Sequence, residues 1–349
     1  MPFTALQIAS GANYTLQTFA RNEPIDQINT EHEVLKWLIA NKEDSSFGNG
    51  YFGEGIYVAN GSNYQNYFGP DEVTYNERDP GLQTKFAYFN YHDGFWFDED
   101  RLAANGIIVG DDPSDTPTQD EKNQLISLLD TSYRALRNGV QDNLALELLQ
   151  DGSQSSKACP GLDYIIDTTP AVGVVGNIDP ASATYWRNNI NMGLTGSDVV
   201  NQMEITHRAC RRYGGMTPDA YFCGAAFLDN YRTQAGVTIN RKIEASGNQK
   251  GGVDLDPSVS GVFFKGKPLI WDPTFEELDT ALGAITYPWT KRCYMAQSKS
   301  IKFRPMKKFW MRNGKPEKLP NRYVTYFGTR SKYGMTTNKR NSMAVLSIA

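Results

Sequence analysis

The sequence predicts an α+β fold in which most strands pair in antiparallel fashion. Two segments, residues 119–150 and 196–215, carry apolar residues at the three- and four-residue steps of amphipathic helices. Strand-like segments and helices do not alternate regularly, as they would in a doubly wound parallel fold. With 349 residues the chain is long enough for about two domains and a sizeable buried core.

Residues 1–46 are predicted to form an N-terminal arm with one short helix. Thr30 and Glu33 fit the S/T-x-x-E capping box, and the segment VLKWLIANK that follows has helical spacing of apolar residues. No basic residue precedes Arg21, and no apolar run approaches 18 residues. The sequence therefore predicts neither a secretory signal nor a transmembrane helix.

Residues 47–98 are predicted to form an extended, irregular β hairpin. From Phe47 to Phe97 the chain has fifteen aromatic residues in 51 positions, against 12% in the whole sequence. A thin hairpin cannot bury that many rings against itself, because isolated hairpins are marginally stable in water. The stretch has six acids and two bases, which is the wrong charge for a groove that binds nucleic acid. A protein partner that covers the rings is predicted instead.

The hairpin begins with GNGYFGEG at residues 48–55, whose first six letters satisfy the dinucleotide fingerprint G-x-G-x-x-G. That fingerprint needs a buried strand before it and a helix after it, so that helix N–H groups meet the pyrophosphate. Here a polar segment precedes it, and a segment broken by Gly61, Gly69 and Pro70 follows. The glycines are therefore interpreted as the base of a hairpin, and no nucleotide cofactor is predicted.

The strongest helix is predicted at about residues 119–150. Thr118 and Glu121 form a second capping box before it, and Asp151-Gly152 ends its apolar repeat. About thirty residues at about 1.5 Å each give a rod roughly 45 Å long. An amphipathic rod of that length is expected to pack one stripe on a sheet.

The second half is predicted to contain short strands, turns and short helices. Residues 161–178 are interpreted as strands and turns, and residues 225–234 as a short helix. GVFFKGKPLIW at 261–271 is interpreted as two strands around a tight Lys-Gly-Lys turn. The spacing of GVFFKGKP also matches a phosphate loop, but Pro268 stands where such a loop has Ser or Thr.

The sequence contains no coherent catalytic or metal-binding pattern. The four cysteines, Cys159, Cys210, Cys223 and Cys293, form no C-x-x-C motif and are interpreted as buried, reduced thiols. His207 lies on a predicted helix among arginines, where a neutral or solvent-facing imidazole is expected. The acid clusters lack the spacing of an EF-hand. No enzyme activity and no metal site are predicted.

Charge is distributed unevenly along the chain. Residues 291–349 contain fifteen Lys or Arg and one acid, Glu317, whereas the preceding 290 residues have a net charge of −18. A basic segment of this kind is compatible with nucleic-acid binding. Salt bridges to acidic surface of the same chain or of a neighbour are an equally suitable explanation, because the basic residues are interleaved with strand-like segments.

The order of these segments resembles the major capsid proteins of tailed bacteriophages, which have the Hong Kong 97-type capsid fold. The resemblance covers most of the chain from about Phe47, and its most specific phrase is GLDYIIDTTPAVGVVGNIDPASATYWRNN at 161–189, with Trp186-Arg187. YGGMTPDAYFCGAAFLDNYRTQ at 213–234 and FFKGKPLIWDP at 263–273 extend it.

The resemblance implies a domain organisation. After an arm at 1–46, residues 47–98 would be the extended loop that lies across a neighbouring subunit. Residues 99–170, 253–275 and 300–349 would form a peripheral domain with a spine helix at about 119–150, and residues 171–252 and 276–299 an axial domain. Tyr67, Phe68 and Tyr75, near the hairpin tip, are the candidate inter-subunit contacts, and Arg78 is a candidate ion-pair partner for an acid of the neighbour.

The implied function is that of a structural subunit. It would form hexamers and pentamers of an icosahedral head that is assembled in the host cytoplasm, encloses double-stranded DNA and is not bound to a membrane. The implied partners are other copies of the chain, a separate scaffolding protein, a portal and a decoration protein. Cross-linking through a loop lysine, as in phage Hong Kong 97, is not expected, because no lysine occurs between Lys42 and Lys85. The alternatives are a DNA-binding protein that uses residues 291–349 and an encapsulin-like compartment shell.

Overall fold

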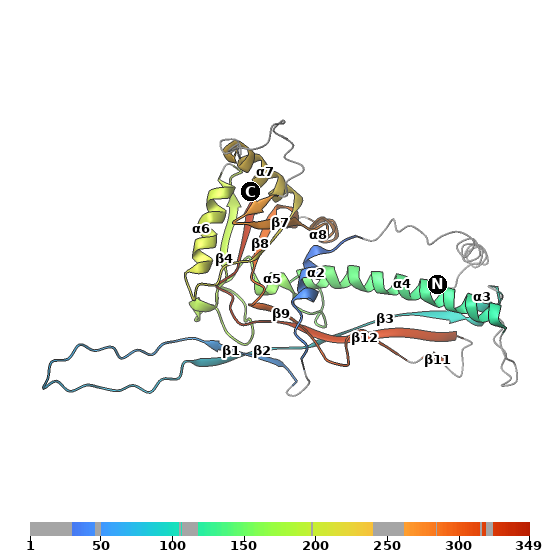
Figure 1. Ribbon diagram of the computed structural model, residues 1–349, viewed down its shortest axis with the longest axis horizontal. Coiled ribbons are helices and arrows are strands. Elements are labelled where there is room, and N and C mark those ends of the chain that lie inside the picture. Colours follow the sequence, from blue (N-terminus) through green and yellow to red (C-terminus); the bar gives the residue numbers. More distant parts are fainter. Residues whose placement is uncertain are drawn as a thin grey trace, which may run out of the picture. The chain divides into compact units, whose positions relative to one another are not determined.

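The structure is a computed structural model (Figure 1), and it describes residues 30–45, 50–104, 106, 118–196, 198–239, 262–283, 285–314, 316–318 and 324–349. Most of the predicted N-terminal arm lies outside the described residues, as do residues 240–261. Within the described part of the chain, no helix is long and apolar enough to cross a membrane.

The described helices and strands are mixed along the chain. The helices are α2 (Glu33–Ala40), α3 (Glu99–Ala104), α4 (Gln119–Leu149), α5 (Leu162–Ile165), α6 (Val199–Arg211), α7 (Ala225–Ile239) and α8 (Thr274–Leu282), with short 3-10 turns η1 (Thr184–Trp186) and η2 (Trp289–Lys291). The strands are β1 (Phe52–Tyr57), β2 (Gly81–Phe86), β3 (Phe89–Asp98), β4 (Asn189–Leu194), β5 (Ala220–Cys223), β6 (Phe263–Phe264), β7 (Lys267–Trp271), β8 (Arg292–Ala296), β9 (Ile301–Pro305), β10 (Arg312–Asn313), β11 (Glu317–Lys318), β12 (Val324–Thr337) and β13 (Ala344–Ile348).

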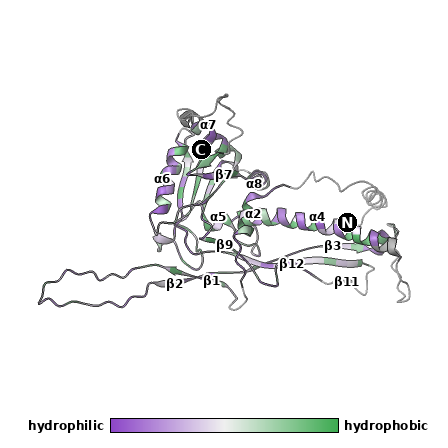
Figure 2. Ribbon diagram, in the orientation of Figure 1, coloured by the Kyte–Doolittle hydropathy of each residue, from purple (hydrophilic) through white to green (hydrophobic). Residues whose placement is uncertain are grey.

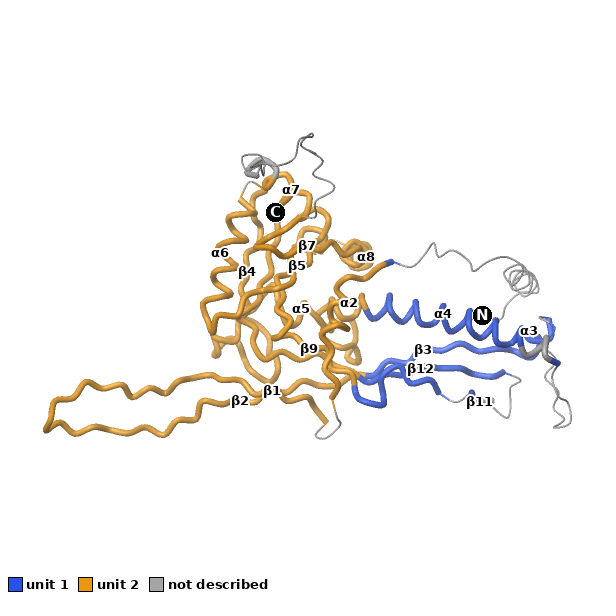
Figure 3. The backbone as a smooth tube through the Cα atoms, in the orientation of Figure 1, with its two compact units in different colours: residues 1–30, 90–144, 306–332 blue, residues 31–89, 145–305, 333–349 orange. Residues whose placement is uncertain are grey.

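The chain divides into two compact units, which Figure 3 shows in blue and orange. Unit 1 comprises residues 1–30, 90–144 and 306–332, and unit 2 comprises residues 31–89, 145–305 and 333–349. Each unit is built from segments that are distant in the sequence. Both therefore depend on long-range strand pairing.

Unit 2 is organised around a six-stranded sheet with the order β4-β13-β8-β5-β7-β6. β4 and β13 are parallel, as are β5 and β7, and the other neighbours in the sheet are antiparallel. Every residue of β5, β8 and β13 is buried. Complete burial of central strands indicates a sheet that is covered on both faces.

Different helices cover the two faces of this sheet. On one face, Met203 of α6 and Phe227 of α7 belong to the same buried cluster as the strand residues Tyr221 and Met295. On the other face, Trp37 of α2 contacts Phe222 edge to face at 5.3 Å. Figure 2 shows hydrophilic and hydrophobic residues alternating along α6, as expected for a helix with one buried stripe.

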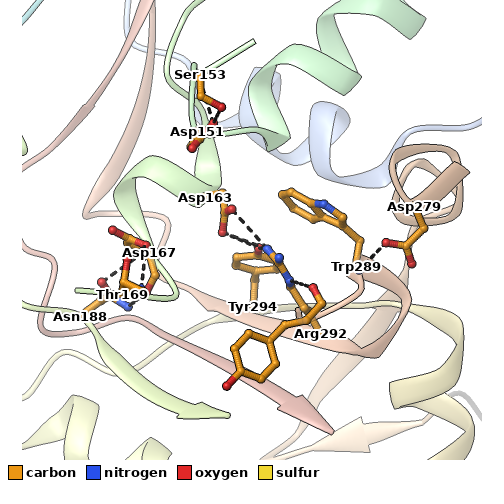
Figure 4. A network of polar contacts seen from close by, with 11 residues as sticks. Asp151, Ser153, Asp163, Asp167, Thr169, Asn188, Asp279, Trp289, Arg292 and Tyr294 are labelled. Atoms are coloured by element: carbon orange, nitrogen blue, oxygen red, sulfur yellow. Dashed lines mark hydrogen bonds and ion pairs between the residues drawn. The ribbon is translucent and has the colours of Figure 1, made fainter. Parts of the chain in front are cut away.

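A buried polar network joins α5 to β8 on the second face (Figure 4). Asp163 accepts hydrogen bonds from Arg292 at 3.2 Å and from the Tyr294 hydroxyl at 2.8 Å. The Arg292 guanidinium also lies 4.3 Å from the centre of the Trp289 ring. Burial raises the pKa of Asp163, and the charge of Arg292 opposes this shift.

Arg340 is a second buried cation in unit 2, and its side chain is fully inaccessible to solvent. It donates hydrogen bonds to the Ile165 carbonyl, the Trp186 carbonyl and the Asn188 side chain at 2.7, 3.2 and 3.1 Å. Burial lowers the pKa of its guanidinium to about 10. Arg340 thus holds the backbone of the segment 161–189 in place, and this segment consists mostly of turns.

Unit 1 combines the long helix α4 with a sheet formed by β3, β12 and β10. β12 pairs with β3 and, in antiparallel fashion, with β10 and β11. Phe95 of β3 stacks on Phe327 of β12 at 5.1 Å and meets Tyr133 of α4 edge to face. Leu128 of α4 is buried in the same cluster. The spine helix is therefore packed on one face of this sheet.

Several sequence predictions are confirmed by the described elements. The α+β class with mainly antiparallel pairing is confirmed, and α4 begins directly after Thr118 and ends at Leu149. The hairpin at 261–271 turns at Lys265 and Gly266, which both have positive φ, the geometry of a type I′ turn. In the described part of the GNGYFGEG segment, residues 50–55, the strand β1 begins at Phe52 and no helix opens.

Two local predictions are wrong. α2 has His32 rather than Thr30 at its N-cap, and the N–H of Val34 donates to Asp272 at 2.7 Å. A distant carboxylate thus satisfies one of the free N–H groups in the first turn of α2. Residues 161–178 contain the helical turn α5 where strands were expected.

The predicted domain limits remain predictions, although the strands bear on the extended loop. The paired strands of the hairpin are β1 and β2. β3, which was included in the loop at 47–98, pairs with β12.

Candidate inter-subunit surface

The β1–β2 hairpin is anchored at its base in unit 2. Phe52 and Phe86 are directly opposite each other across the two strands, and both are buried. The Lys85 N–H donates to the Gly176 carbonyl at 3.0 Å. Gly176 has a φ of +62°, and a Cβ there would lie 2.7 Å from the Phe86 ring. Only glycine lets this turn approach the hairpin so closely.

A charged contact also secures the base. The Glu54 carboxylate accepts hydrogen bonds from the Arg304 guanidinium and from the Thr336 hydroxyl, and Arg304 also lies 3.0 Å from Glu43. The base of the hairpin is therefore tied to β9 and β12 through side chains as well as through packing.

The tip of the hairpin, residues 58–80, is held by hydrogen bonds within itself. Asn63 donates to the hydroxyl of Thr74 at 2.9 Å, and Gln65 donates to the same hydroxyl. At the turn, two hydrogen bonds join Phe68 and Asp71. The Asp71 N–H donates to the Phe68 carbonyl at 2.7 Å, and the Phe68 N–H donates to the Asp71 carboxylate at 2.8 Å. These bonds give the tip a definite shape, and Figure 1 shows it projecting from the strands β1 and β2.

The predicted contact residues lie together on this tip and are exposed. Tyr67, Phe68 and Tyr75 are 70%, 81% and 91% exposed. Arg78 is also exposed, its stem lies 3.6 Å from the position of a Cβ on Gly61, and no acid of the described residues pairs with it. Tyr64, 84% exposed, belongs to the same set and was not singled out from the sequence. Large exposed aromatic residues in one place are typical of a protein interface.

The tip is acidic as well as aromatic. Asp71, Glu72, Glu77 and Asp79 are exposed, and Arg78 is the base among them. A surface that covers the tip should therefore offer aromatic contacts and positive charge.

A groove with these properties lies on unit 1, on the face of the sheet opposite α4. It has a volume of about 520 Å³. Most of its lining comes from alternate residues of three strands: His92, Gly94 and Trp96 of β3, Tyr326, Gly328 and Arg330 of β12, and Arg312 and Gly314 at β10. Phe95, Asn313 and Phe327 complete the lining. Side chains two residues apart share one face of a strand, which explains this pattern. Glycines form the floor, and a Cβ on Gly94 would lie 2.6 Å from the Phe327 carbonyl oxygen.

Two arginines at the groove face each other across the strands. Arg312 of β10 is directly opposite Arg330 of β12, and both are exposed. Like charges directly opposite each other destabilise a strand pair. Neither arginine has an acidic partner among the described residues. An anionic group in the groove would relieve this repulsion.

Only part of this groove could have been recognised from the sequence. In the strand segment FNYHDGFWFD, alternate side chains point to opposite faces of the sheet. His92 and Trp96 lie on the face opposite Phe95 and Phe97, so this alternation alone predicts that Trp96 is exposed. The arginines come from strands more than 200 residues further along the chain, and only the fold brings them beside Trp96.

The basic C-terminal segment is not one continuous binding surface. Arg292 pairs with Asp163, Arg304 with Glu54, and Arg340 is buried. Lys291 donates to the Ala349 carbonyl at 2.9 Å, and Lys339 to the Tyr213 carbonyl. At least five of the segment's fifteen basic residues therefore bind groups of the same chain.

The described residues form no group of three or more His, Cys, Asp or Glu that could hold a metal ion. All four cysteines are free and buried, as predicted. Partial burial and Lys265 lower the pKa of His207, which keeps the imidazole neutral at pH 7, as expected.

Comparison of the sequence with protein-family models finds no match, and a search of curated proteins also finds none. Solved structures are similar in fold. A chain of the cyanophage A-1(L) capsid asymmetric unit aligns with a TM-score of 0.59 and 14% identity, covering 93% of this chain and 96% of that chain. A chain of the capsid of Myoviridae phage XM1 aligns with a TM-score of 0.57 and 8% identity, covering 94% and 95%.

A chain from Gordonia phage Cozz aligns with a TM-score of 0.53 and 12% identity, covering 95% of this chain and 92% of that chain. At these identities the similarity concerns the fold, and it extends over nearly the whole of each chain. The predicted fold is therefore confirmed: this chain has the Hong Kong 97-type fold of tailed-phage capsid proteins.

Proposed function

We propose that the protein is the major capsid protein of a tailed bacteriophage, a structural subunit without catalytic activity. Copies would form hexamers and pentamers that close into an icosahedral head around double-stranded DNA. One observation carries the proposal: a chain with this fold holds four aromatic side chains, at 70–91% exposure, on a hairpin tip whose contacts with the rest of the described chain lie at its base. Such a tip is stabilised when another molecule covers it.

The tip of one copy would bind in the unit 1 groove of a neighbouring copy. The acids beside Tyr67 and Phe68 would meet Arg312 and Arg330, and the aromatic rings would pack on Trp96 and Tyr326. Charge complementarity and aromatic contacts support this arrangement. The contact is heterologous, since two different surfaces meet, and such contacts generate rings when the rotation closes.

Alanine at Tyr67, Phe68, Tyr75 and Arg78 tests the tip. We expect the fourfold variant to keep the melting temperature of the unassembled chain and to lose rings and shells, because these side chains contact little of their own chain. Light scattering behind a sizing column and negative-stain electron microscopy would measure assembly. Alanine at the exposed Lys307 and Lys308 is the matched control. Unchanged assembly of the fourfold variant would exclude the tip as an inter-subunit contact.

A charge exchange tests the pairing with the groove. Arg330→Glu alone should weaken assembly at least tenfold, because it places an acid opposite the acidic tip. Adding Asp71→Arg and Glu72→Arg to the same chain should restore part of the loss. If the combined variant assembles no better than Arg330→Glu alone, the tip binds elsewhere on its neighbour.

The remaining partners follow from this role: a separate scaffolding protein, a portal, a decoration protein and the packaged DNA. The protein would be located in the virion after assembly in the host cytoplasm. Expression of the chain alone tests the scaffold. Efficient formation of closed shells of uniform size would contradict the need for a separate scaffolding protein.

The rival function, DNA binding through residues 291–349, predicts a discrete monomer or dimer whose DNA affinity falls steeply with salt. The internal pairing of Arg292, Arg304 and Arg340 favours a structural use of that segment. An encapsulin-like compartment shell shares the fold. Shells that enclose nuclease-resistant DNA would favour a phage head, and shells that enclose a protein cargo would favour the compartment.

A further inference from the structure

Two cysteines lie in contact at the centre of the six-stranded sheet. Cys223 of β5 and Cys293 of β8 are directly opposite each other in antiparallel register, and their sulfur atoms are 3.2 Å apart. β8 and β5 are the two middle strands of the sheet. The shell function proposed above does not use this pair.

The register is suitable for a disulfide. The Gly224 N–H donates to the Arg292 carbonyl at 3.0 Å, so the adjacent pair Cys223–Cys293 is a non-hydrogen-bonded pair of the ladder. Such pairs have Cα atoms about 4.5 Å apart, within the range of about 4.4–6.8 Å that disulfides span. The side chains also share one face, because both belong to the cluster under α6 and α7. Bond formation requires the sulfur atoms to approach to about 2.05 Å, a small movement.

Burial keeps Cys223 as a thiol in the folded chain. Cys223 and Cys293 have no exposed surface, and burial together with the neighbouring thiol raises the pKa of Cys223 far above its usual range. Thiolates are the species that attack disulfides. Oxidation of the pair therefore requires β5 and β8 to separate locally, and the reducing cytoplasm preserves the thiols during synthesis and assembly.

We propose that Cys223 and Cys293 form an intrachain disulfide when the protein passes from a reducing to an oxidising environment. With a low-molecular-weight disulfide as the oxidant, one cysteine thiolate attacks it, forms a mixed disulfide and releases one thiol. The second cysteine then displaces the other thiol. The pair loses two protons and two electrons, and the oxidant is reduced to two thiols. This disulfide goes beyond the proposed function. Only the moment of its formation rests on that function, because a virion would meet an oxidising environment when the host cell lyses.

The bond would lock the middle of the sheet. It closes a loop of 70 residues that contains α7, β6, β7 and α8. A covalent link between β5 and β8 restricts the unfolded chain and prevents separation of the two central strands. The oxidised protein should therefore melt at least about 4 °C higher than the reduced protein.

Incubation of the purified full-length chain with oxidised glutathione tests the proposal. After denaturation, we expect two of the four thiols to be titratable, and peptide mapping to find Cys223 joined to Cys293. The oxidation rate should rise in mild urea, which opens the sheet. Because this experiment needs no assembled particle, its failure would be distinguishable from failure of the capsid proposal.

Two variants test whether the disulfide joins Cys223 to Cys293 and not other cysteines. Cys293→Ala should abolish both the disulfide and the gain in melting temperature. Cys210→Ala removes a buried thiol of the same cluster and should leave both unchanged. Four titratable thiols after prolonged incubation just below the melting temperature would overturn the proposal. A linkage through Cys159 or Cys210, or an oxidised protein that melts no higher, would also overturn it.

Discussion

The hairpin tip and the six-stranded sheet use the same residue types in opposite environments. In the sheet, Tyr221, Phe222 and Tyr294 have no exposed surface. In the tip, Tyr75 and Phe68 are 91% and 81% exposed. The aromatic rings of the sheet are covered by α2, α6, α7 and α8 of their own chain, whereas the tip extends beyond the last paired residues of β1 and β2.

This difference separates folding from association. Burial of apolar surface stabilises a protein by about 25 cal/mol per Å², and a large aromatic residue buries about 150–250 Å². The sheet gains this stabilisation when the chain folds. The tip gains it only when another molecule covers the rings. Substitutions in the sheet should therefore change the stability of the single chain, and substitutions in the tip should change assembly.

The largest effect on folding is expected from Arg340→Met. The variant keeps an unbranched stem but removes the Arg340 donor from the Ile165 and Trp186 carbonyls, and it removes one of the two hydrogen bonds that Asn188 Oδ1 accepts. We expect the free energy of unfolding to fall by about 3 kcal/mol or more. Urea denaturation of the unassembled chain would measure it.

Arg340→Lys is the control for charge. It keeps a cation but loses the planar fork that reaches three acceptors, so its cost should be intermediate. If Arg340→Met unfolds at the same urea concentration as the wild type, Arg340 is not part of the folding core.

The sequence predicted the elements whose signals are local. The long apolar repeat of α4 and the Lys265-Gly266 turn lie within single short windows, and both were located correctly. α5 has four residues, which is too few to show a period. The donor at the start of α2 is satisfied by Asp272, 238 residues away, so no local pattern could reveal it.

The candidate site divides in the same way. Tyr67, Phe68 and Tyr75 were predicted because aromatic density is visible along the chain. The groove joins Trp96 to Arg312 and Arg330, and it depends on the pairing of β12 with β3 and β10. In the sequence, Arg312 and Arg330 do not differ from the other bases of the C-terminal segment. The register of β10 and β12 places them opposite each other.

A smaller effect, whose size depends on pH, is expected from Asp163→Asn. The variant keeps the hydrogen-bonding shape but removes the charge beside Arg292, and should lower the free energy of unfolding by about 1 kcal/mol at pH 7. Burial raises the pKa of Asp163 above its ordinary value of 3.8. Between the ordinary pKa of 3.8 and the raised pKa of the folded state, the folded protein binds more protons than the unfolded protein. The stability that Asp163 contributes therefore falls as pH rises through this range.

The deficit of Asp163→Asn should therefore grow when the pH is lowered from about 7 to about 4. Urea titrations of both proteins at the two pH values measure this change, and the difference between them cancels the contribution of other groups. A deficit that shrinks in acid would mean that Arg292 outweighs burial and lowers the pKa of Asp163.

The smallest effect on folding is expected from Thr74→Val in the hairpin tip. Valine has the shape of threonine but cannot accept the bonds from Asn63 and Gln65. These bonds are exposed and compete with water, so the free energy of unfolding should change by less than about 0.5 kcal/mol. The same bonds hold the tip in one shape before it binds, and their loss adds an ordering cost to association. Assembly followed by light scattering should therefore slow several-fold while the melting temperature is unchanged. If Thr74→Val and the wild type assemble at the same rate, the neighbouring subunit imposes the shape of the tip. The tip would then be ordered only on binding, whereas the sheet is ordered when the chain folds.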